Sequence, residues 1–451
     1  MVRSRASRCI VAAVLAAAIG LGGPAAAAQG VRDGSAPAAG TAAASSADHP
    51  DETARSDRGS ARPAIRYTLP PDRYQKARSM ALVRFWGTLL GFLWGVGALW
   101  LILRSKWSAK YRDWAERASR RRFVQAYVFA PLLVLTIEVL RFPFAVLRNL
   151  IMVRYGFSVQ GWGSWFWDWV KGELVLVLLA TIVVWVLYAV IRRSPRRWWL
   201  YFWLASLPIG LAVTFLQPLV MEPLFFKFEP LAQKAPALAA GLQRMVQHAG
   251  QDIPPERMFW MGAREKLTYI NAYVSGFGAS KRIVVWDTTI EKMPAPQIVF
   301  VVGHEMGHFV LRHIAKFLGV VAVLLFALFY LGHRTIDWLL ARKGAAWGVR
   351  GVDDWASLPA LLLLMSVFLF CVTPGLNALI RRYERQADQY GLEVTRGVTP
   401  DAGRVCAHAF QTIGDSDLSD PEPNSIMVFL NDDHPPIPER MQFCLQGELV
   451  P

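Results

Sequence analysis

Six long apolar segments constrain the fold of this chain more than any other feature of its sequence. Each is close to the roughly 20 residues that a helix needs to cross the hydrocarbon core of a bilayer. Hydrophobic residues make up 54% of the 451-residue chain and charged residues 18%, a balance typical of a protein that exposes much surface to lipid. The sequence therefore predicts a mainly α-helical, polytopic membrane bundle, with spans at about 80–103, 123–147, 172–192, 198–220, 316–333 and 357–380.

The first residues of the chain resemble a secretory signal. Three arginines precede a short apolar stretch and an Ala-rich site that suits signal peptidase. We predict a signal peptide at residues 1–28, cleaved before Gln29, and the alternative is an uncleaved anchor helix. Residues 29–65 are rich in Ala, Ser, Gly, Asp and Arg, so they are predicted to form a disordered linker.

The positive charge of the chain is gathered beside the apolar segments. The formal net charge is +15, but the Lys and Arg residues lie mostly at the ends of the predicted spans, which argues against a nucleic-acid partner. The positive-inside rule places the basic loops 104–122, 192–197 and 334–350 in the cytoplasm. The polar region 221–315 and the C-terminal tail then lie outside, on the side to which a secretory signal also sends residue 29.

The polar region between the fourth and fifth spans has its own secondary structure. We expect an amphipathic helix at about Leu231 to Ala249 and a strand over the β-branched run Arg282 to Trp286. A further helix is predicted to open near Pro294 and Pro296, because proline suits a first helical turn.

Cysteine use is sparse. Cys406 and Cys444 can pair if their compartment is oxidising, a question that the sequence leaves open. The chain has no C-x-x-C pair, so a thiolate zinc finger is not supported.

The strongest functional signal is the motif His304-Glu305-Met306-Gly307-His308, an H-E-x-x-H sequence. On a helix, residues i and i+4 share a face, so His304 and His308 can bind one metal ion while Glu305 holds a metal-bound water. The run before the motif is apolar enough for a buried helix, where an unpaired glutamate is costly. A surface helix with two solvated histidines is the alternative, and the metal site is the favoured interpretation.

A catalytic zinc usually has three protein ligands and a water, so the two histidines need a partner. The best candidate is Glu384, which directly follows the sixth predicted span. Asp388 lies one turn further on the same face and can orient a ligand histidine or donate a proton. The alternative is an exposed helix in which the charged residues of 381–388 pair with each other.

Two further segments are candidates for contact with a substrate. His434 and Arg440 flank prolines that fix the backbone, so His434 can be held where it stabilises an oxyanion; a surface turn is the alternative. Asn271 and Ala272 belong to a predicted edge strand, and such a strand can pair with an extended peptide.

Other polar residues are predicted to have no catalytic part. Glu138 and Arg141 lie one turn apart inside the second span and are expected to form a structural ion pair. His313 lies five residues beyond His308, off the metal face of a continuous helix, and is assigned no role.

These motifs in order resemble the type I CAAX prenyl endopeptidases, integral-membrane zinc proteases of the gluzincin type, and specifically a bacterial-type member with a signal peptide. The similarity covers about residues 66–445. It rests on Tyr67 to Ala77, Arg154 to Phe157, Pro223 to Phe228, Asn271 to Tyr273, Lys281 to Val284, His304 to His308, Arg381 to Asp388, His434 to Pro436 and Arg440.

The resemblance implies a helical membrane chamber that encloses a zincin-like α+β catalytic region with a short sheet edge. It divides the chain into an N-terminal transmembrane domain at 66–227 and a zinc metallopeptidase domain at 228–451, which includes the spans 316–333 and 357–380. The implied site comprises one Zn²⁺ held by His304, His308 and Glu384, with Glu305 as general base, Asp388 as proton donor or orienting group, His434 near the oxyanion, and Asn271, Ala272 and Arg440 near the substrate.

The expected function is therefore zinc-dependent endopeptidase activity inside a membrane, on peptide or membrane-protein substrates. The location that fits the charge distribution is a bacterial inner membrane, with the catalytic region facing the periplasm. Because CAAX processing follows cytosolic prenylation, this orientation argues against prenylated substrates. The alternatives are a broad-specificity quality-control protease and a non-catalytic membrane receptor or scaffold that keeps a structural zinc.

Overall fold

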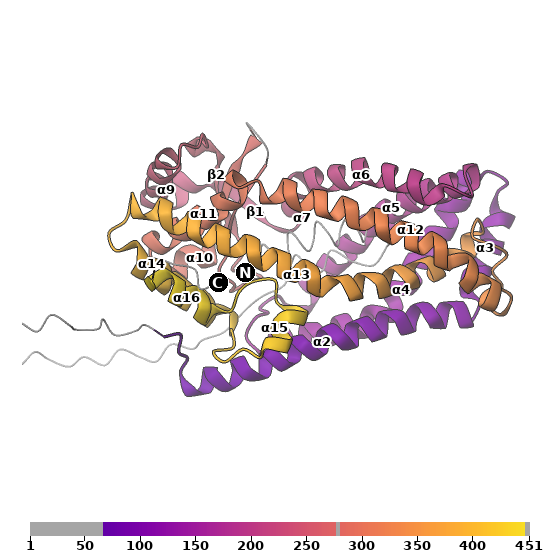
Figure 1. Cartoon of the computed structure of the whole chain (residues 1–451), viewed down its shortest axis with the longest axis horizontal. Coiled ribbons are helices and arrows are strands. Elements are labelled where there is room, and N and C mark those ends of the chain that lie inside the picture. The colour runs from indigo at the N-terminus through magenta and orange to yellow at the C-terminus, as the bar shows by residue number, and fades with distance from the viewer. Residues whose placement is uncertain (1–65, 277–279, 447–451) are drawn as a thin grey trace, which may run out of the picture.

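The computed structural model describes residues 66–276 and 280–446, so the predicted signal peptide and linker at 1–65 lie outside the described residues. The described chain is mostly helical, with a small sheet at one end (Figure 1). Its elements are α2 Pro71–Arg104, α3 Trp107–Ala118, α4 Arg122–Arg154, α5 Trp162–Arg193, α6 Trp198–Leu216, the π-turn Gln217–Met221, α7 Glu222–Phe225, β1 Lys227–Pro230, α8 Leu231–Lys234, α9 Pro236–His248, the 3₁₀ turn Pro255–Arg257, β2 Met258–Gly262, β3 Ala272–Ser275, β4 Arg282–Trp286, α10 Asp287–Lys292, α11 Ala295–Val310, α12 His313–Trp347, the 3₁₀ turn Trp355–Ser357, α13 Leu358–Arg396, α14 Ala402–Asp417, α15 Ser425–Asn431 and α16 Ile437–Gln446.

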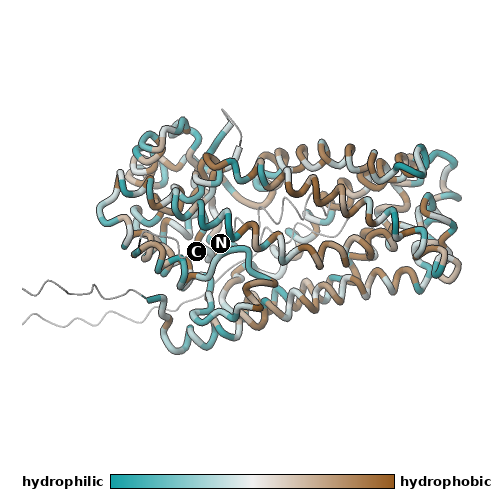
Figure 2. Tube along the Cα trace, in the orientation of Figure 1, coloured by the Kyte–Doolittle hydropathy of each residue, from teal (hydrophilic) through white to brown (hydrophobic). Residues whose placement is uncertain are grey.

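Six helices of the described chain are long and apolar enough to cross a membrane, as the sequence predicts. They contain 28 to 42 residues, more than the roughly 20 that a span requires. Each therefore extends beyond the hydrocarbon core, and Figure 2 shows apolar residues along the helices and polar residues at both ends of the molecule. Only 22–44% of the most apolar window of each helix is buried within the protein, so the remaining apolar surface needs lipid.

The basic loops meet at one end of this bundle, at the right of Figure 1, around α3. Arg112 of α3 is buried and donates to Asp354 over 2.6 Å and to the Gly348 carbonyl over 2.8 Å. Arg350 pairs with Glu116 at 2.9 Å. These contacts tie α3 to the connection between α12 and α13, because a buried charge must be paired to be tolerated.

The polar end of the molecule, at the left of Figure 1, carries a four-stranded sheet of order β1-β2-β4-β3. β2 runs parallel to β4, and the two outer pairs are antiparallel. The predicted strand over 282–286 is confirmed as β4, whose residues Ile283 to Trp286 are buried as expected for a central strand. β3 forms one edge of the sheet, which confirms an edge strand in this segment, but the strand begins at Ala272 and Asn271 lies just before it.

The prediction of one continuous amphipathic helix at 231–249 is wrong, because the structure has two helices there. The structure divides this segment into α8 and α9 at Ala235, whose φ of −147° and ψ of 71° lie outside the helical region. Ala235 precedes Pro236, and the proline ring clashes with a helical conformation of the preceding residue.

The two largest apolar clusters of the described residues lie at the two ends of the molecule's core. One lies among the spanning helices and includes Phe129, Tyr188 and Trp355. The other joins the sheet to α9, α11, α14 and α16, with Phe300 of α11 packed edge-on against Phe410 of α14. The second cluster fixes α11 against the sheet.

The pairing that the sequence leaves open is present: Cys406 and Cys444 form a disulfide that joins α14 to α16, with their Cα atoms 5.6 Å apart. The predicted ion pair within α4 is also confirmed, because Arg141 donates to Glu138 over 3.0 Å. Both contacts are structural, and the disulfide places α16 against the same cluster as α11.

Candidate metal centre

The H-E-x-x-H motif lies on α11, a buried helix that opens after Pro294 as predicted. One face of this helix packs in the apolar cluster that includes the sheet. Its residues there are Ile298, Val302 and Met306. The motif residues are themselves largely buried, and Glu305 is only 7% exposed. The alternative interpretation, a surface helix with two solvated histidines, is therefore excluded.

The second half of the site comes from α13, which continues without a break from the membrane to Arg396. α11 and α13 approach so closely that a Cβ added at Gly307 would lie 3.2 Å from the Cα of Ala387. A Cβ at Gly391 would lie 2.8 Å from the backbone nitrogen of His304. Small residues on both helices thus permit the contact that brings Glu384 beside the histidines.

The three predicted metal ligands converge on one point. The Nε2 atoms of His304 and His308 are 3.2 Å apart, and each lies 3.3 Å from an oxygen of Glu384. Four ligand atoms placed tetrahedrally at about 2.0–2.1 Å from a zinc ion are about 3.3–3.4 Å from each other. The three separations fit the edges of such a tetrahedron, and two imidazoles with one carboxylate form a donor set that zinc accepts.

Asp388 lies behind this ligand set. Its Oδ1 is 2.8 Å from Nδ1 of His304 and 2.5 Å from Nη2 of Arg440, whose Nε donates to Oδ2 over 2.8 Å. Both carboxylate oxygens are engaged by donors, and the residue is buried. This arrangement fixes the orientation of the His304 ring, with its Nε2 directed at the ligand centre.

Arg440 is buried beside Asp388 and lies 3.6 Å from Glu384. Its guanidinium also lies over the Phe410 ring, 4.1 Å from the centroid. The contacts of Arg440 are thus with the ligand-bearing helix and the apolar cluster. These contacts indicate that Arg440 stabilises the site from inside the protein.

The site favours positive charge. Burial by itself lowers the pKa of His304, but its contacts with Asp388 and Glu384 raise that pKa to about 9. For His434, burial likewise lowers the pKa, while the charge of Glu384 and the hydrogen bond to Asp433 raise it above its usual value. A potential that stabilises protons on two buried imidazoles also stabilises a bound cation.

His434 lies next to the ligand set. Its Nε2 is 3.1 Å from Oε2 of Glu384, and its Nδ1 is 2.9 Å from Oδ1 of Asp433. Arg381 of α13 donates to the carbonyls of Val428 and Asp432. The segment after α15 is thereby fastened to α13, and this explains why a residue 50 positions from Glu384 in sequence (384 to 434) reaches it.

His313, which the sequence places off the metal face, is not one of the three converging ligands, but it contacts the ligand His308. α11 ends at Val310, Arg312 has a left-handed φ of 56°, and a new helix, α12, begins at His313. Its Nδ1 lies 3.2 Å from Nδ1 of His308, and its Nε2 lies 2.9 Å from Oε1 of Gln386. No sequence signal marks this break, because arginine has no preference for that conformation.

Ala272 is the first residue of β3, which packs against α11, and Asn271 directly precedes the strand. The Asn271 backbone is bound to the inner side of the fold, since its N–H donates to Thr289 and its carbonyl accepts from Trp286. Ala272 is buried and is paired with Val285 of β4. These backbone bonds of Asn271 and the pairing of Ala272 are thus directed toward Thr289 and β4.

A ligand set of two histidines and a glutamate, with a second glutamate in an H-E-x-x-H helix, defines a metallopeptidase, and six long apolar helices place it in a membrane. Residues 232–446 match the model described as peptidase family M48, and residues 55–227 match the one described as CAAX prenyl protease N-terminal, five membrane helices. The chain is 33% identical to the uncharacterized metalloprotease YhfN of Bacillus subtilis, over 84% of its own length and 89% of the relative. It belongs to peptidase family M48.

More distant relatives agree. The human CAAX prenyl protease 1 homolog is 23% identical, over 84% of this chain and 87% of that protein. The crystal structure of S. mikatae Ste24p superposes with a TM-score of 0.71 at 18% identity, over 83% of this chain and 90% of that one. The resemblance to this family is therefore confirmed, and the chain is an integral, multi-pass metalloendopeptidase.

Proposed function

We propose that the metal of this endopeptidase is a single zinc ion held by His304, His308 and Glu384. The observation that carries the proposal is the set of three ligand separations of 3.2–3.3 Å, which match a tetrahedral zinc site. Only three protein groups of the described chain converge there. A catalytic rather than a structural site is favoured, since a structural zinc takes four protein ligands.

The roles of the surrounding residues follow from their positions. Zinc, when bound, supplies a Lewis acid that lowers the pKa of water and polarises the scissile carbonyl. Glu305 accepts the proton of the attacking water as general base and delivers it to the leaving amine. His434, whose raised pKa favours the protonated imidazole, donates a hydrogen bond to the developing oxyanion.

Asp388 and Arg440 act through His304 and Glu384 in this proposal. Asp388 accepts from Arg440 and lies 2.8 Å from Nδ1 of His304, so it is suited to hold a ligand ring in place. The predicted proton donation by Asp388 is less well supported than orientation, because both of its oxygens are occupied by donors.

The substrate is proposed to bind as an extended strand along the outer edge of β3. Ala272 is the first residue of that strand, Asn271 directly precedes it, and β3 packs against the helix that carries the motif. Backbone hydrogen bonds along a strand edge recognise a peptide without demanding one sequence. Peptide segments of membrane proteins are the proposed substrates.

We propose that the catalytic end lies on the extracytoplasmic side of the membrane. In a bacterium with two membranes, this side is the periplasm. The arginine-rich loops lie at the opposite end of the bundle, and a disulfide lies at the catalytic end. Disulfides persist in oxidising compartments. Because prenylation is cytosolic, this orientation favours unprenylated membrane proteins, and hence a quality-control function, over prenylated peptides.

The test compares purified wild-type protein with Glu305→Gln and, as matched control, Glu393→Gln, an exposed glutamate of α13. Each is given a prenylated peptide and its unmodified twin. Glu305→Gln should keep zinc, measured by mass spectrometry of the metal, and lose about 10²–10⁴-fold in kcat. Full turnover by Glu305→Gln contradicts the mechanism, and cleavage of only the prenylated peptide contradicts the proposed substrate class.

A further inference from the structure

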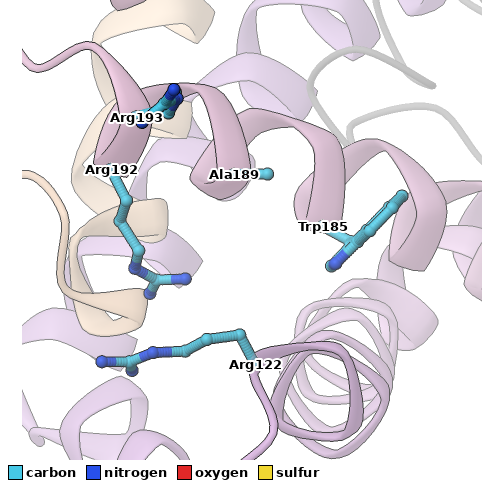
Figure 3. Close-up of a pocket in the computed structure, with 5 residues that line it drawn as sticks. All are labelled: Arg122, Trp185, Ala189, Arg192 and Arg193. Atoms are coloured by element: carbon cyan, nitrogen blue, oxygen red, sulfur yellow. The ribbon is translucent and has the colours of Figure 1, made fainter.

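A pocket of about 360 Å³ opens at the end of the bundle opposite the metal centre. It lies where α4 begins and α5 ends, and Figure 3 shows the side chains around it. Its wall changes from cationic to apolar along α5. The lining residues are Arg122, Trp185, Ala189, Arg192 and Arg193.

The cationic part of the pocket lacks a carboxylate. Arg122 and Arg192 extend toward each other across the pocket (Figure 3). Arg122 donates to the neutral amide of Gln125 over 2.9 Å, and Arg192 donates to the backbone carbonyl of Asp353 over 3.0 Å. Within residues 66–276 and 280–446, neither arginine forms a salt bridge; the nearby Asp354 is already paired with Arg112 at 2.6 Å. Two like charges held face to face favour a bound anion.

The arginines are held in place by neutral contacts. The Arg192 guanidinium lies 4.1 Å from the centroid of the Trp355 ring and 5.3 Å from that of Tyr188. Trp355 and Tyr188 are both buried. Arg192 is therefore preorganised by aromatic stacking and does not have to be ordered when a ligand binds.

The apolar part of the pocket is formed by α5, one of the six helices apolar enough to span a membrane. Trp185 is 38% exposed and meets Phe123 edge-on, with ring centroids 5.6 Å apart. Ala189, one turn further along α5, leaves space between the indole and the arginines. A tryptophan beside arginines at the end of a span is typical of the boundary between acyl chains and headgroups.

We propose that this pocket binds an anionic phospholipid, with the phosphate between Arg122 and Arg192 and an acyl chain along Ala189 and Trp185. Basic pockets between transmembrane helices on the cytoplasmic side bind such headgroups, and the basic loops of this chain lie at this end. A soluble anion would use the arginines alone. The lipid also uses the apolar wall of α5, the most apolar of the six spans.

The first experiment measures lipid binding by native mass spectrometry of the full protein in a neutral detergent. The probes are dioleoylphosphatidylglycerol and dioleoylphosphatidylcholine. Arg122→Gln/Arg192→Gln should weaken phosphatidylglycerol binding by about thirtyfold, since each charge near a headgroup counts for about fivefold. The matched control Arg104→Gln/Arg342→Gln removes two exposed arginines at the same end of the bundle and should retain wild-type affinity. Equal loss in both variants overturns the proposal.

A second variant tests the shape of the pocket without changing the net charge or the arginines. Ala189→Phe fills the pocket and should also weaken phosphatidylglycerol binding, whereas Ala327→Phe, at an exposed position of α12, should not. Unchanged binding in Ala189→Phe overturns the proposal. So does displacement of the lipid by millimolar glycerol 3-phosphate, which would identify a free-phosphate site. Glu305→Gln should bind the lipid like wild type, so this result is independent of the proposed catalysis.

Discussion

At the residue scale, the contact between His313 and His308 gives the most specific expectation. A ligand imidazole that binds metal through Nε2 carries its proton on Nδ1, and that proton needs an acceptor. His313 Nδ1 lies 3.2 Å from Nδ1 of His308, and Gln386 accepts from the other nitrogen of His313. The two hydrogen bonds together fix one orientation of the His308 ring.

His313→Ala should therefore weaken zinc binding about 10–100-fold. The measurement is competition with a chelator of known affinity, followed by residual peptidase activity at saturating zinc. His408→Ala, an exposed histidine of α14, is the control and should bind zinc normally. His313→Asn retains an acceptor and should recover part of the affinity. Zinc binding by His313→Ala equal to that of wild type would show that the contact has no positioning role.

Arg440 can be tested for two different roles, support of the site and contact with substrate. Its pairing with buried Asp388 means that Arg440→Met leaves a carboxylate buried without its partner, at about 3–5 kcal/mol of unfolding free energy. Arg385→Met removes an exposed arginine 3.5 Å from Glu439 and should cost about 1 kcal/mol or less. Chemical denaturation measures both.

The opposite pattern would favour the substrate role. If Arg440→Met unfolds like wild type, holds zinc, and shows only a raised KM, then Arg440 contacts the substrate and the internal support inferred from its hydrogen bonds is wrong.

At the element scale, the metal site depends on the close approach of α11 and α13. Gly391 faces the His304 backbone, where an added Cβ would come within 2.8 Å of nitrogen. Gly391→Ala should force the helices apart, lower stability by about 1–3 kcal/mol, and reduce zinc affinity. Gly375→Ala on the same helix meets nothing within 4 Å and should be neutral or slightly stabilising, because alanine is the better helix former.

Thermal unfolding compares the stability of the two glycine variants, and zinc titration compares their zinc affinity. Equal behaviour of Gly391→Ala and Gly375→Ala would mean that the helix contact is looser than the structure indicates.

The elements also show how far sequence reasoning reaches. Apolar length predicted the spans, and the i, i+4 spacing placed His304 and His308 on one face. The continuation of the sixth span predicted the approach of Glu384. The break at Arg312 was missed because the left-handed conformation of one arginine depends on tertiary packing, and the split at Ala235 was missed although the following proline marks it. The pairing of Arg440 with Asp388 joins residues 52 apart, and no local pattern reveals such a contact.

At the scale of the whole molecule, the disulfide and the arginine-rich end are the two features on which the proposed orientation in the membrane rests. The Cys406–Cys444 bond closes a loop with a sequence separation of 38 that contains α15 and the His434 segment. In the chain-entropy account such a loop contributes about 4 kcal/mol. Cys406→Ser should lower stability by up to that amount, while Cys371→Ser, at an exposed free cysteine, should change it little.

Maleimide labelling tests whether the disulfide forms in cells. The protein is taken from cells, unfolded without reductant and then labelled. Protection of Cys406 and Cys444 that is lost on reduction is expected for a catalytic end outside the cytoplasm. Labelling of both cysteines without reductant would contradict that orientation.

The most direct test of the account is zinc-edge X-ray absorption of the purified protein and of Glu384→Ala. The account predicts one zinc ion per chain with two imidazoles and a carboxylate among nitrogen and oxygen ligands at about 2.0–2.2 Å. It also predicts that Glu384→Ala changes the coordination and loses zinc more readily. A sulfur ligand, a different number of imidazoles, or an unchanged spectrum and zinc affinity in Glu384→Ala would contradict it.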